Sequence, residues 1–339
     1  MPAPLKVTRA QVLAFRRRTG ALDERLPAGA ASLQRAARAG LTDSMPRAAL
    51  LGLHARVEGV GPTAWDDPAL VQVWGPRYSV YVVPVDDLAI FTFGRLPDTG
   101  KTRARAQDLA ARLQVVLAGE VTRDTDVAAV LGVKGWELKY AALTGTIAIR
   151  WEGARAPILW TVPPPTVEAA EATRELARRF LHVFGPSEPA AFAGWAGIGE
   201  DKAARVFAEL EPELVPVRAP LGEARVLALD EATIREPAAP TTGVRLLPSG
   251  DAYTLGVTRA ERAFLLPDED QRGALWTPRV WPGAVLVDGK IAGTWRRAKR
   301  VITIDAWRKL SGAAREAVVA EAEALPLPDP GEGMTVHWS

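Results

Sequence analysis

Hydrophobic residues along the chain follow helical spacing and then strand spacing, and this order occurs three times, in segments that we call rounds. Each round has three short helices followed by two strands around a turn. In the first round, helices are expected over residues 8–18, 30–39 and 46–57, and strands over 71–74 and 79–83. Thr8 is the expected N-cap of the first helix, and Gly40 is expected to end the second. The turn between the two strands holds Arg77 at its tip.

The second and third rounds repeat this arrangement. The second has expected helices over 103–118, 125–131 and 135–143, and strands over 146–151 and 156–162. The third has expected helices over 168–184, 189–195 and 201–210, and strands over 214–217 and 224–229. Proline-rich segments over 163–165 and 236–243 are expected linkers on either side of the third round.

Three short helices closed by a β-hairpin are typical of the winged helix-turn-helix unit, in which one helix enters a DNA groove. After residue 243 the pattern changes to strands and ends in a helix near 312–324. The sequence therefore predicts an α+β fold of tandem winged helix-turn-helix units followed by a small β-rich C-terminal portion. The expected boundaries are 1–98, 99–165, 166–236 and 237–339. Ordinary α+β packing of helices and hairpins is the alternative.

The composition excludes several kinds of chemistry. The 339 residues include no cysteine and three histidines, so disulfides, thiolate nucleophiles and cysteine-ligated metals are excluded, and we expect no metal and no cofactor. No apolar run reaches the roughly 18 residues of a membrane helix, and the N-terminus lacks a secretion signal. We therefore expect a soluble, cytoplasmic protein, with a monomer favoured. Nucleotide-binding loops and metalloprotease motifs are also absent from the sequence.

The net charge of +2 conceals an uneven distribution of basic residues. Residues 1–40 hold eight basic and two acidic side chains, and residues 290–309 hold seven and one, so each segment carries +6. Such segments favour a polyanion partner, although solvated helix faces would give the same pattern. The residues expected to bind nucleic acid are Arg56, Arg77, Lys101, Arg103, Arg105, Arg296, Arg297, Lys299 and Arg300.

Several segments resemble the winged-helix DNA-binding family that includes the AlkZ-like DNA glycosylases. They are residues 48–56, 177–181, 184–186, 192–195, 246–248 with Asp251, and 287–296. The resemblance implies tandem winged helices folded into a curved body with a basic concave channel, which binds double-stranded DNA. It also implies excision of alkylated purines or unhooking of bulky crosslinked bases.

The catalytic signature of that family is Gln, an apolar residue, and then Gln or Asp, and this chain departs from it. The matching stretch is residues 40–44, where Thr42 and Ser44 occupy the two polar positions and Asp43 the middle one. A shift of one residue would place Asp43 in a catalytic position. A helix N-cap is the alternative role for these residues. His54 is a weaker candidate that could assist a water or touch a phosphate, and a structural histidine is its alternative.

Hydrolysis of an N-glycosidic bond passes through a positively charged, oxocarbenium-like sugar. An alkylated purine is already cationic and leaves readily, so the protein must mainly hold the flipped nucleotide, orient a water and stabilise that charge. A carboxylate serves both of the last two needs, which makes Asp43 the strongest electrostatic candidate of its segment. Two hypotheses follow, a DNA-repair glycosylase and a non-catalytic DNA-binding protein that acts as damage sensor or regulator.

Overall fold

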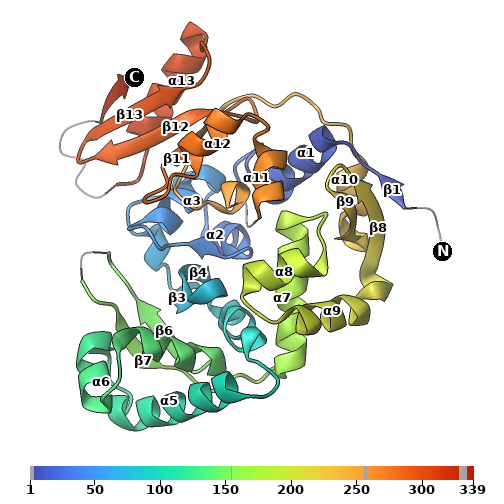
Figure 1. The fold of residues 1–339 in the computed structure, drawn as a ribbon. Helices are drawn as coiled ribbons and strands as arrows, with labels where there is room; N and C mark the ends of the chain where they lie inside the picture. Colours follow the sequence, from blue (N-terminus) through green and yellow to red (C-terminus); the bar gives the residue numbers. More distant parts are fainter. Residues whose placement is uncertain (1–3, 154, 256–257, 328–333) are drawn as a thin grey trace.

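The computed structural model describes residues 4–153, 155–255, 258–327 and 334–339 of the chain. It is a mixed α+β structure with sheets of three, five and six strands (Figure 1). Within the described residues, none of the helices has the length and apolar composition needed to cross a bilayer.

The first round forms the helices α1 (Arg9–Thr19), α2 (Ala30–Ala37) and α3 (Ala48–Arg56). Thr8 caps α1 as expected, because its hydroxyl accepts a hydrogen bond from the Gln11 amide. The third helix was expected to begin near Pro46. It begins two residues later, because Arg47 adopts a left-handed backbone conformation with φ of 66°.

A six-stranded sheet joins the hairpins of the first two rounds. Its strands lie in the order β2 (Leu41–Thr42), β4 (Val80–Pro84), β3 (Leu70–Trp74), β6 (Ile147–Arg150), β7 (Ile158–Thr161) and β5 (Thr122–Arg123). The two hairpins meet where Gln72 of β3 pairs antiparallel with Ile149 of β6. The sheet therefore continues across the expected boundary at residue 98.

The helices of the second round cover part of this sheet. They are α5 (Lys101–Leu117), α6 (Asp124–Leu131) and a 3₁₀ segment over Gly135–Thr144, where a regular helix was expected. Leu109 and Leu113 of α5 and Leu138 of the 3₁₀ segment are buried against Ile149 and Leu159 of the sheet. These contacts form the local core of the round.

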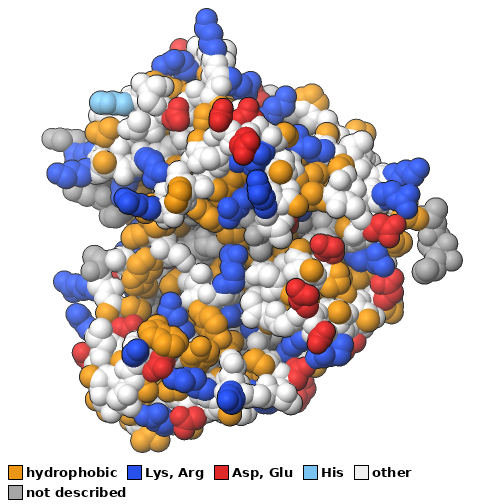
Figure 2. Space-filling model, in the orientation of Figure 1, with side chains coloured by type: hydrophobic (Ala, Val, Ile, Leu, Met, Phe, Trp, Pro, Cys, Tyr) orange, Lys and Arg blue, Asp and Glu red, His pale blue; other side chains and the backbone are white. Residues whose placement is uncertain are grey.

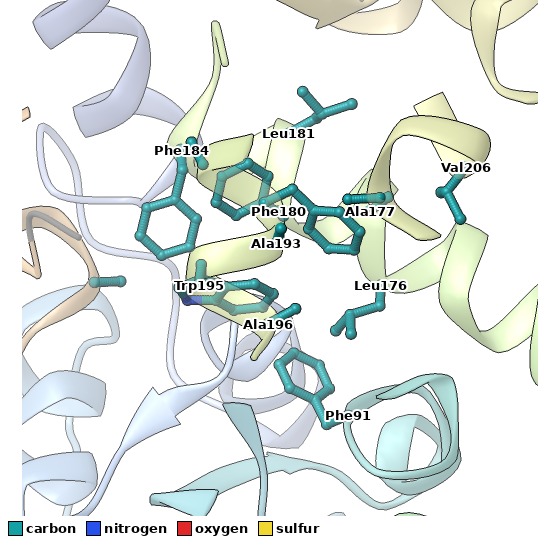
Figure 3. Close-up of a cluster of buried hydrophobic side chains, with 14 of the residues drawn as sticks. Phe91, Leu176, Ala177, Phe180, Leu181, Phe184, Ala193, Trp195, Ala196 and Val206 are labelled. Atoms are coloured by element: carbon teal, nitrogen blue, oxygen red, sulfur yellow. The ribbon is translucent and has the colours of Figure 1, made fainter. Parts of the chain in front are cut away.

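The third round contributes α7 (Ala169–Phe184), α8 (Pro189–Ala196) and α9 (Glu200–Glu209), followed by β8 (Leu214–Ala219) and β9 (Gly222–Leu227). The N-terminal strand β1 (Leu5–Lys6) lies parallel to β8 in a three-stranded sheet. Short helices α4 (Leu88–Phe91) and α10 (Glu231–Arg235) flank this round. Buried aromatic rings fill its centre (Figure 3), and they are Phe91, Phe180, Phe184, Phe192 and Trp195.

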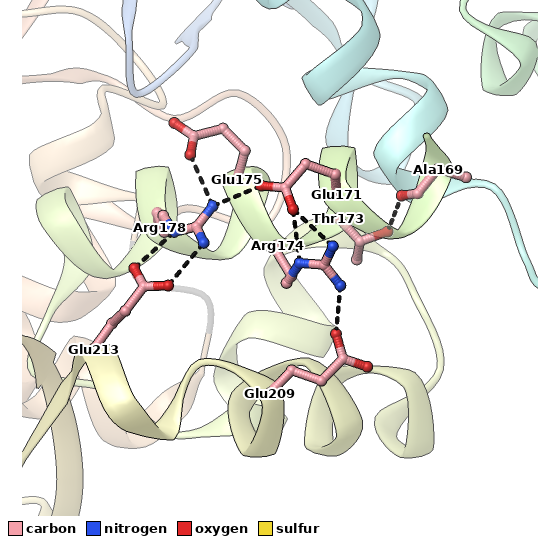
Figure 4. A network of polar contacts seen from close by, with 8 residues as sticks. All are labelled: Ala169, Glu171, Thr173, Arg174, Glu175, Arg178, Glu209 and Glu213. Atoms are coloured by element: carbon pink, nitrogen blue, oxygen red, sulfur yellow. Dashed lines mark hydrogen bonds and ion pairs between the residues drawn. The ribbon is translucent and has the colours of Figure 1, made fainter. Parts of the chain in front are cut away.

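Ion pairs on the outer side fasten α7 to the next elements (Figure 4). Arg174 contacts Glu209 of α9 at 2.7 Å, and Arg178 contacts Glu213 at 2.8 Å. Both arginines also bind Glu171 of α7 itself, and hydrogen bonds from them lower the pKa of that carboxyl. Glu171, Glu209 and Glu213 therefore neutralise arginines of the same round.

Within its described residues, the C-terminal portion holds the five-stranded sheet and three helices. The strands are β10 (Val244–Leu247), β11 (Gly283–Val287), β12 (Lys290–Ala298), β13 (Val301–Ala306) and β14 (Thr335–Trp338), in that order. Helix α13 (Gly312–Glu323) forms where a helix was expected, and it packs on the sheet. The expectation of strands alone before it was wrong, because α11 (Arg259–Leu265) and α12 (Glu269–Leu275) precede β11. Their N-caps, Thr258 and Asp268, were the missed signals.

Candidate nucleic-acid interface

The candidate catalytic segment begins with Thr42 at the end of β2 and continues with Asp43 and Ser44 in the loop before α3. The three side chains have different surroundings. The Thr42 hydroxyl donates a hydrogen bond to the Gly250 carbonyl at 2.7 Å. The Asp43 amide donates to the Val80 carbonyl at 2.8 Å, and its side chain turns inward. Ser44 is exposed. Asp43 is thus buried, Thr42 is partly exposed and Ser44 is exposed.

The Asp43 carboxylate lies beneath the surface, with 1% of the residue exposed. Oδ1 accepts a hydrogen bond from the Ala49 amide at 3.0 Å, and Oδ2 accepts one from Gln72 Nε2 at 2.6 Å. Burial raises the pKa of Asp43 from 3.8 to about 7, against the opposing effects of the Ala49 amide and of Arg47. Because the carboxylate binds the first turn of α3, this geometry favours the helix-capping role.

Gln72 connects this buried carboxylate to the surface, and the sequence did not single it out. Its Nε2 donates to the Trp151 carbonyl at 3.3 Å, and its Oε1 accepts from the Trp151 amide at 2.5 Å. The available signal was a buried polar residue within the otherwise apolar strand Leu70–Trp74. Through Gln72, the first-round loop and the second-round hairpin share one hydrogen-bond network.

The tip of the second-round hairpin also packs directly against the loop. The guanidinium groups of Arg47 and Arg150 lie 4.1 and 4.9 Å from the Trp65 ring centre. Gly153 adopts a φ of 90°, and a Cβ atom there would lie 2.5 Å from Pro46 Cγ. This position therefore requires glycine, and the close contact holds residues 44–47 in place.

A groove of about 560 Å³ opens beside Ser44, and we call it the candidate groove. The residues that line it are Ser44, Trp74, Arg77, Tyr78, Ser79, Val80, Asp124, Gly135, Trp136, Lys139, Trp151 and Pro157. Tyr78 and Trp136 each meet Tyr140 edge-on, with ring centres 5.3 and 6.1 Å apart. Figure 2 shows hydrophobic and basic side chains along a hollow between the C-terminal sheet and the region of α5 and β7. Basic groups beside open aromatic rings suit a nucleic-acid backbone and unstacked bases.

Two of the candidates from the sequence line this groove, Ser44 and Arg77. Arg77 is exposed at the hairpin tip, with φ of 55°. Burial lowers the pKa of Arg262 on α11, and the positive charge of Arg77 lowers it further. Arg262 in turn lies 5.0 Å from the Trp281 ring centre. Positive charge and aromatic surface thus continue from the first hairpin toward the C-terminal portion.

The remaining basic candidates lie in three kinds of place. Arg296, Arg297 and Lys299 are exposed at the end of β12 and its turn, with Arg300 partly exposed beside them. Lys101 is exposed at the start of α5, whereas Arg103 bonds the Pro97 carbonyl and Arg105 pairs with Glu137. Arg56 is buried, and it donates to both oxygens of Asp251 at 2.7 and 2.8 Å. It therefore belongs to the protein interior rather than to a DNA-facing surface.

His54 also lies inside the protein. It is 7% exposed, and its Nε2 lies 3.7 Å from Glu321 Oε1 of α13. Burial lowers the pKa of His54, while Glu321 opposes that change and Arg25 adds to it. The side chain faces the C-terminal helix, and it does not line the candidate groove.

The expectation that residues 1–40 form a basic face was wrong for most of their arginines. Arg16 is buried and donates to the carbonyls of Phe184 and Gly185 at 2.5 and 3.1 Å. Arg9 reaches the Phe264 and Leu265 carbonyls, Arg18 reaches Glu236, and Arg25 pairs with Glu321. These arginines connect the N-terminal segment to the third round and the C-terminal portion.

The described residues hold no cluster of three or more histidine or acidic side chains that could bind a metal ion. The helix–hairpin rounds followed by a five-stranded C-terminal sheet form an AlkZ-like fold. The model of the family described as DNA glycosylase AlkZ-like matches residues 35–326, and the chain belongs to this family. The resemblance seen in the sequence is thereby confirmed.

Two comparisons give the relationship in detail. The structure of the Streptomyces sahachiroi DNA glycosylase AlkZ superimposes with a TM-score of 0.80 over 99% of this chain and 100% of that one, at 19% identity. This match shows the shared fold. An interstrand DNA cross-link repair glycosylase of Streptomyces sahachiroi is 30% identical over 132 residues. The aligned segment spans 38% of this chain and 35% of that relative.

The raised pKa of Asp43 predicts a pH dependence of stability. Between pH 4 and 7 the folded chain retains a proton that the unfolded chain has released, so the free energy of unfolding falls as pH rises through this range. Asp43→Asn should remove this component, which is on the order of a few kcal/mol. Urea unfolding at pH 5 and pH 8 measures it, with the exposed Asp126→Asn as control. Equal pH dependence in wild type and Asp43→Asn would contradict the prediction.

Proposed function

We propose that the protein binds duplex DNA along the candidate groove and hydrolyses the N-glycosidic bond of an alkylated, bulky or crosslinked base. The observation that carries this proposal is that one groove is lined by a hydroxyl, two basic side chains and three aromatic rings. These belong to Ser44, Arg77, Lys139, Tyr78, Trp136 and Trp151. Membership of the AlkZ-like family and the similarity to an interstrand DNA cross-link repair glycosylase support it. On this proposal the three helix–hairpin rounds act as winged-helix units.

Each part of the groove has a chemical task in this reaction. Arg77 and Lys139 neutralise phosphates, which positions the duplex without reading its sequence. The exposed Trp136 and its neighbours offer π faces for a base that has left the stack. The Ser44 hydroxyl can orient a water, and the cationic damaged base leaves as a neutral molecule. No metal is needed for this chemistry, since the leaving group is already activated.

A base-release assay tests the enzyme hypothesis. Purified protein is incubated with separate duplexes that carry 7-methylguanine, 3-methyladenine or an interstrand crosslink, and free base is measured by chromatography. We expect release from at least one lesion, and undamaged duplex is the control. Absence of release from every duplex would contradict the proposed reaction.

A non-catalytic DNA-binding protein is the second candidate function, and the geometry of the loop favours it in one respect. The Asp43 carboxylate is buried and bonded through both oxygens, and the Thr42 hydroxyl is bonded to Gly250. Such a protein would serve as damage sensor or regulator. Lesion-selective binding without base release would support this second function.

The basic turn of the C-terminal sheet predicts how binding responds to salt. A variant with Arg296, Arg297 and Lys299 changed to alanine should bind duplex more weakly, with a salt slope reduced by up to about 0.9 per lost phosphate contact. Fluorescence anisotropy across a salt series measures the slope. The control variant loses the same amount of positive charge on and beside the three-stranded sheet of β1, β8 and β9 (Figure 1). In it, alanine replaces Arg218 of β8, Arg225 of β9 and Arg235 of α10. Equal slopes for the two variants would exclude this turn from the interface.

A further inference from the structure

Asp124 belongs to the second round and lines the candidate groove. It begins α6 directly after the edge strand β5, and its amide donates to the Pro157 carbonyl at 2.9 Å. It is the one acidic residue among the described residues that line the candidate groove. Its Oδ1 atom is buried and has no hydrogen-bond partner within the described parts of the chain.

An acidic residue in the first turn of a helix is often explained by the helix dipole. Asp126 lies in the same turn of α6, is exposed, and meets that need without lining the groove. Asp124 differs because it is half-buried on a wall that also holds Arg77 and Lys139. Burial raises the pKa of Asp124, while the Thr125 amide and Lys139 act against that change and Asp126 adds to it.

A lone carboxylate is unfavourable in a groove that must receive a polyanion, unless positive charge arrives with the substrate. Glycosidic bond cleavage creates such a charge on the sugar. Asp43 is too deeply buried to meet it, since 1% of that residue is exposed and both its oxygens are bonded. Asp124 is therefore the one carboxylate that lines the groove within the described parts of the chain.

We propose that Asp124 is the catalytic carboxylate of this protein, a role that rests on the proposed function. The water oxygen bonds to C1′ while the C1′–N bond breaks, and the bonding electron pair leaves with the base and neutralises its positive charge. Asp124 stabilises the cationic sugar during this exchange and accepts one proton of the water, which it then releases to solvent. The carboxylate thus comes from the second round rather than from the first-round loop.

Two synthetic duplexes test the electrostatic part without any damaged base. One carries a cationic azaribose at a single position, and the other carries the neutral tetrahydrofuran analogue. Wild type should bind the cationic duplex about tenfold more tightly. Asp124→Asn should lose this preference, and Asp126→Asn should keep it. A preference that persists in Asp124→Asn, or that is absent from wild type, would overturn the proposal.

Single-turnover base release completes the test. Asp124→Asn should slow release about 100-fold without weakening the binding of undamaged duplex, whereas Asp126→Asn should match wild type. Thermal unfolding of both variants establishes that they are folded. If Asp124→Asn releases base at the wild-type rate, the proposal is wrong even though the proposed function holds. If wild type prefers the cationic duplex but releases no base, the proposed reaction is wrong and Asp124 only binds the cationic sugar, so its catalytic role is overturned as well.

Discussion

Replacement of Asp251 with alanine is expected to lower the free energy of unfolding by about 3–5 kcal/mol. Arg56 donates two hydrogen bonds to this carboxylate, and the side chains are only 4% and 1% exposed. Loss of the carboxylate leaves a guanidinium without its counter-charge inside the protein. Asp251 also accepts a hydrogen bond from the Tyr253 amide at 2.9 Å, so the change disturbs the backbone after β10 as well.

Urea unfolding at constant pH measures the loss. Glu231→Ala is a suitable control, because it removes the exposed partner of Arg235 one helical turn away and should cost less than about 0.5 kcal/mol. Changing Arg56 to Met together with Asp251→Ala should recover part of the stability, since no buried charge is then left alone. A loss below about 1 kcal/mol in Asp251→Ala would contradict the buried ion pair.

The second large effect is expected for Phe180→Ala, at about 3–5 kcal/mol. Phe180 is 1% exposed, and its ring centre lies 5.3–5.5 Å from those of Phe184, Phe192 and Trp195 (Figure 3). Removal of the ring leaves a cavity between α7 and α8, because the neighbouring aromatic side chains are held by their own contacts and cannot fill it.

The same unfolding experiment compares Phe180→Ala with Leu229→Ala, a truncation at a residue that is 73% exposed. Leu229→Ala should change stability by no more than about 0.5 kcal/mol. A comparable small effect for both variants would show that the aromatic cluster does not support the fold.

The sequence predicted the helices and hairpins of the three rounds closely, because their hydrophobic periods and caps are local. The N-cap at Thr8 is an example. Pairing between distant segments left no such local pattern, so the parallel pair of Leu5 with Val217 and the join of Gln72 with Ile149 were not predicted. These two contacts change three separate hairpins into sheets that cross the expected boundaries.

The candidate site was predicted in part. Ser44 and Arg77 line the groove, since both lie in exposed turns that the pattern located correctly. Arg56 and His54 lie on α3, whose nine residues are all buried, and charge alone could not reveal that burial. Asp124 was not among the candidates, because nothing in the local sequence sets it apart and its groove forms only when the second round folds against the first.

The shared sheet has a consequence for attempts to dissect the protein. A fragment ending at residue 98 would lose β6, so β3 would become an open edge with the sequence Leu-Val-Gln-Val-Trp. Four of these five side chains are apolar, and an uncovered strand of that kind promotes association between chains. The fragment would also lose the backbone partner of Gln72 at Trp151. The repeated helix–hairpin pattern therefore does not mark segments that fold when they are separated from the rest of the chain. A soluble N-terminal fragment has to extend beyond Thr161, the end of β7.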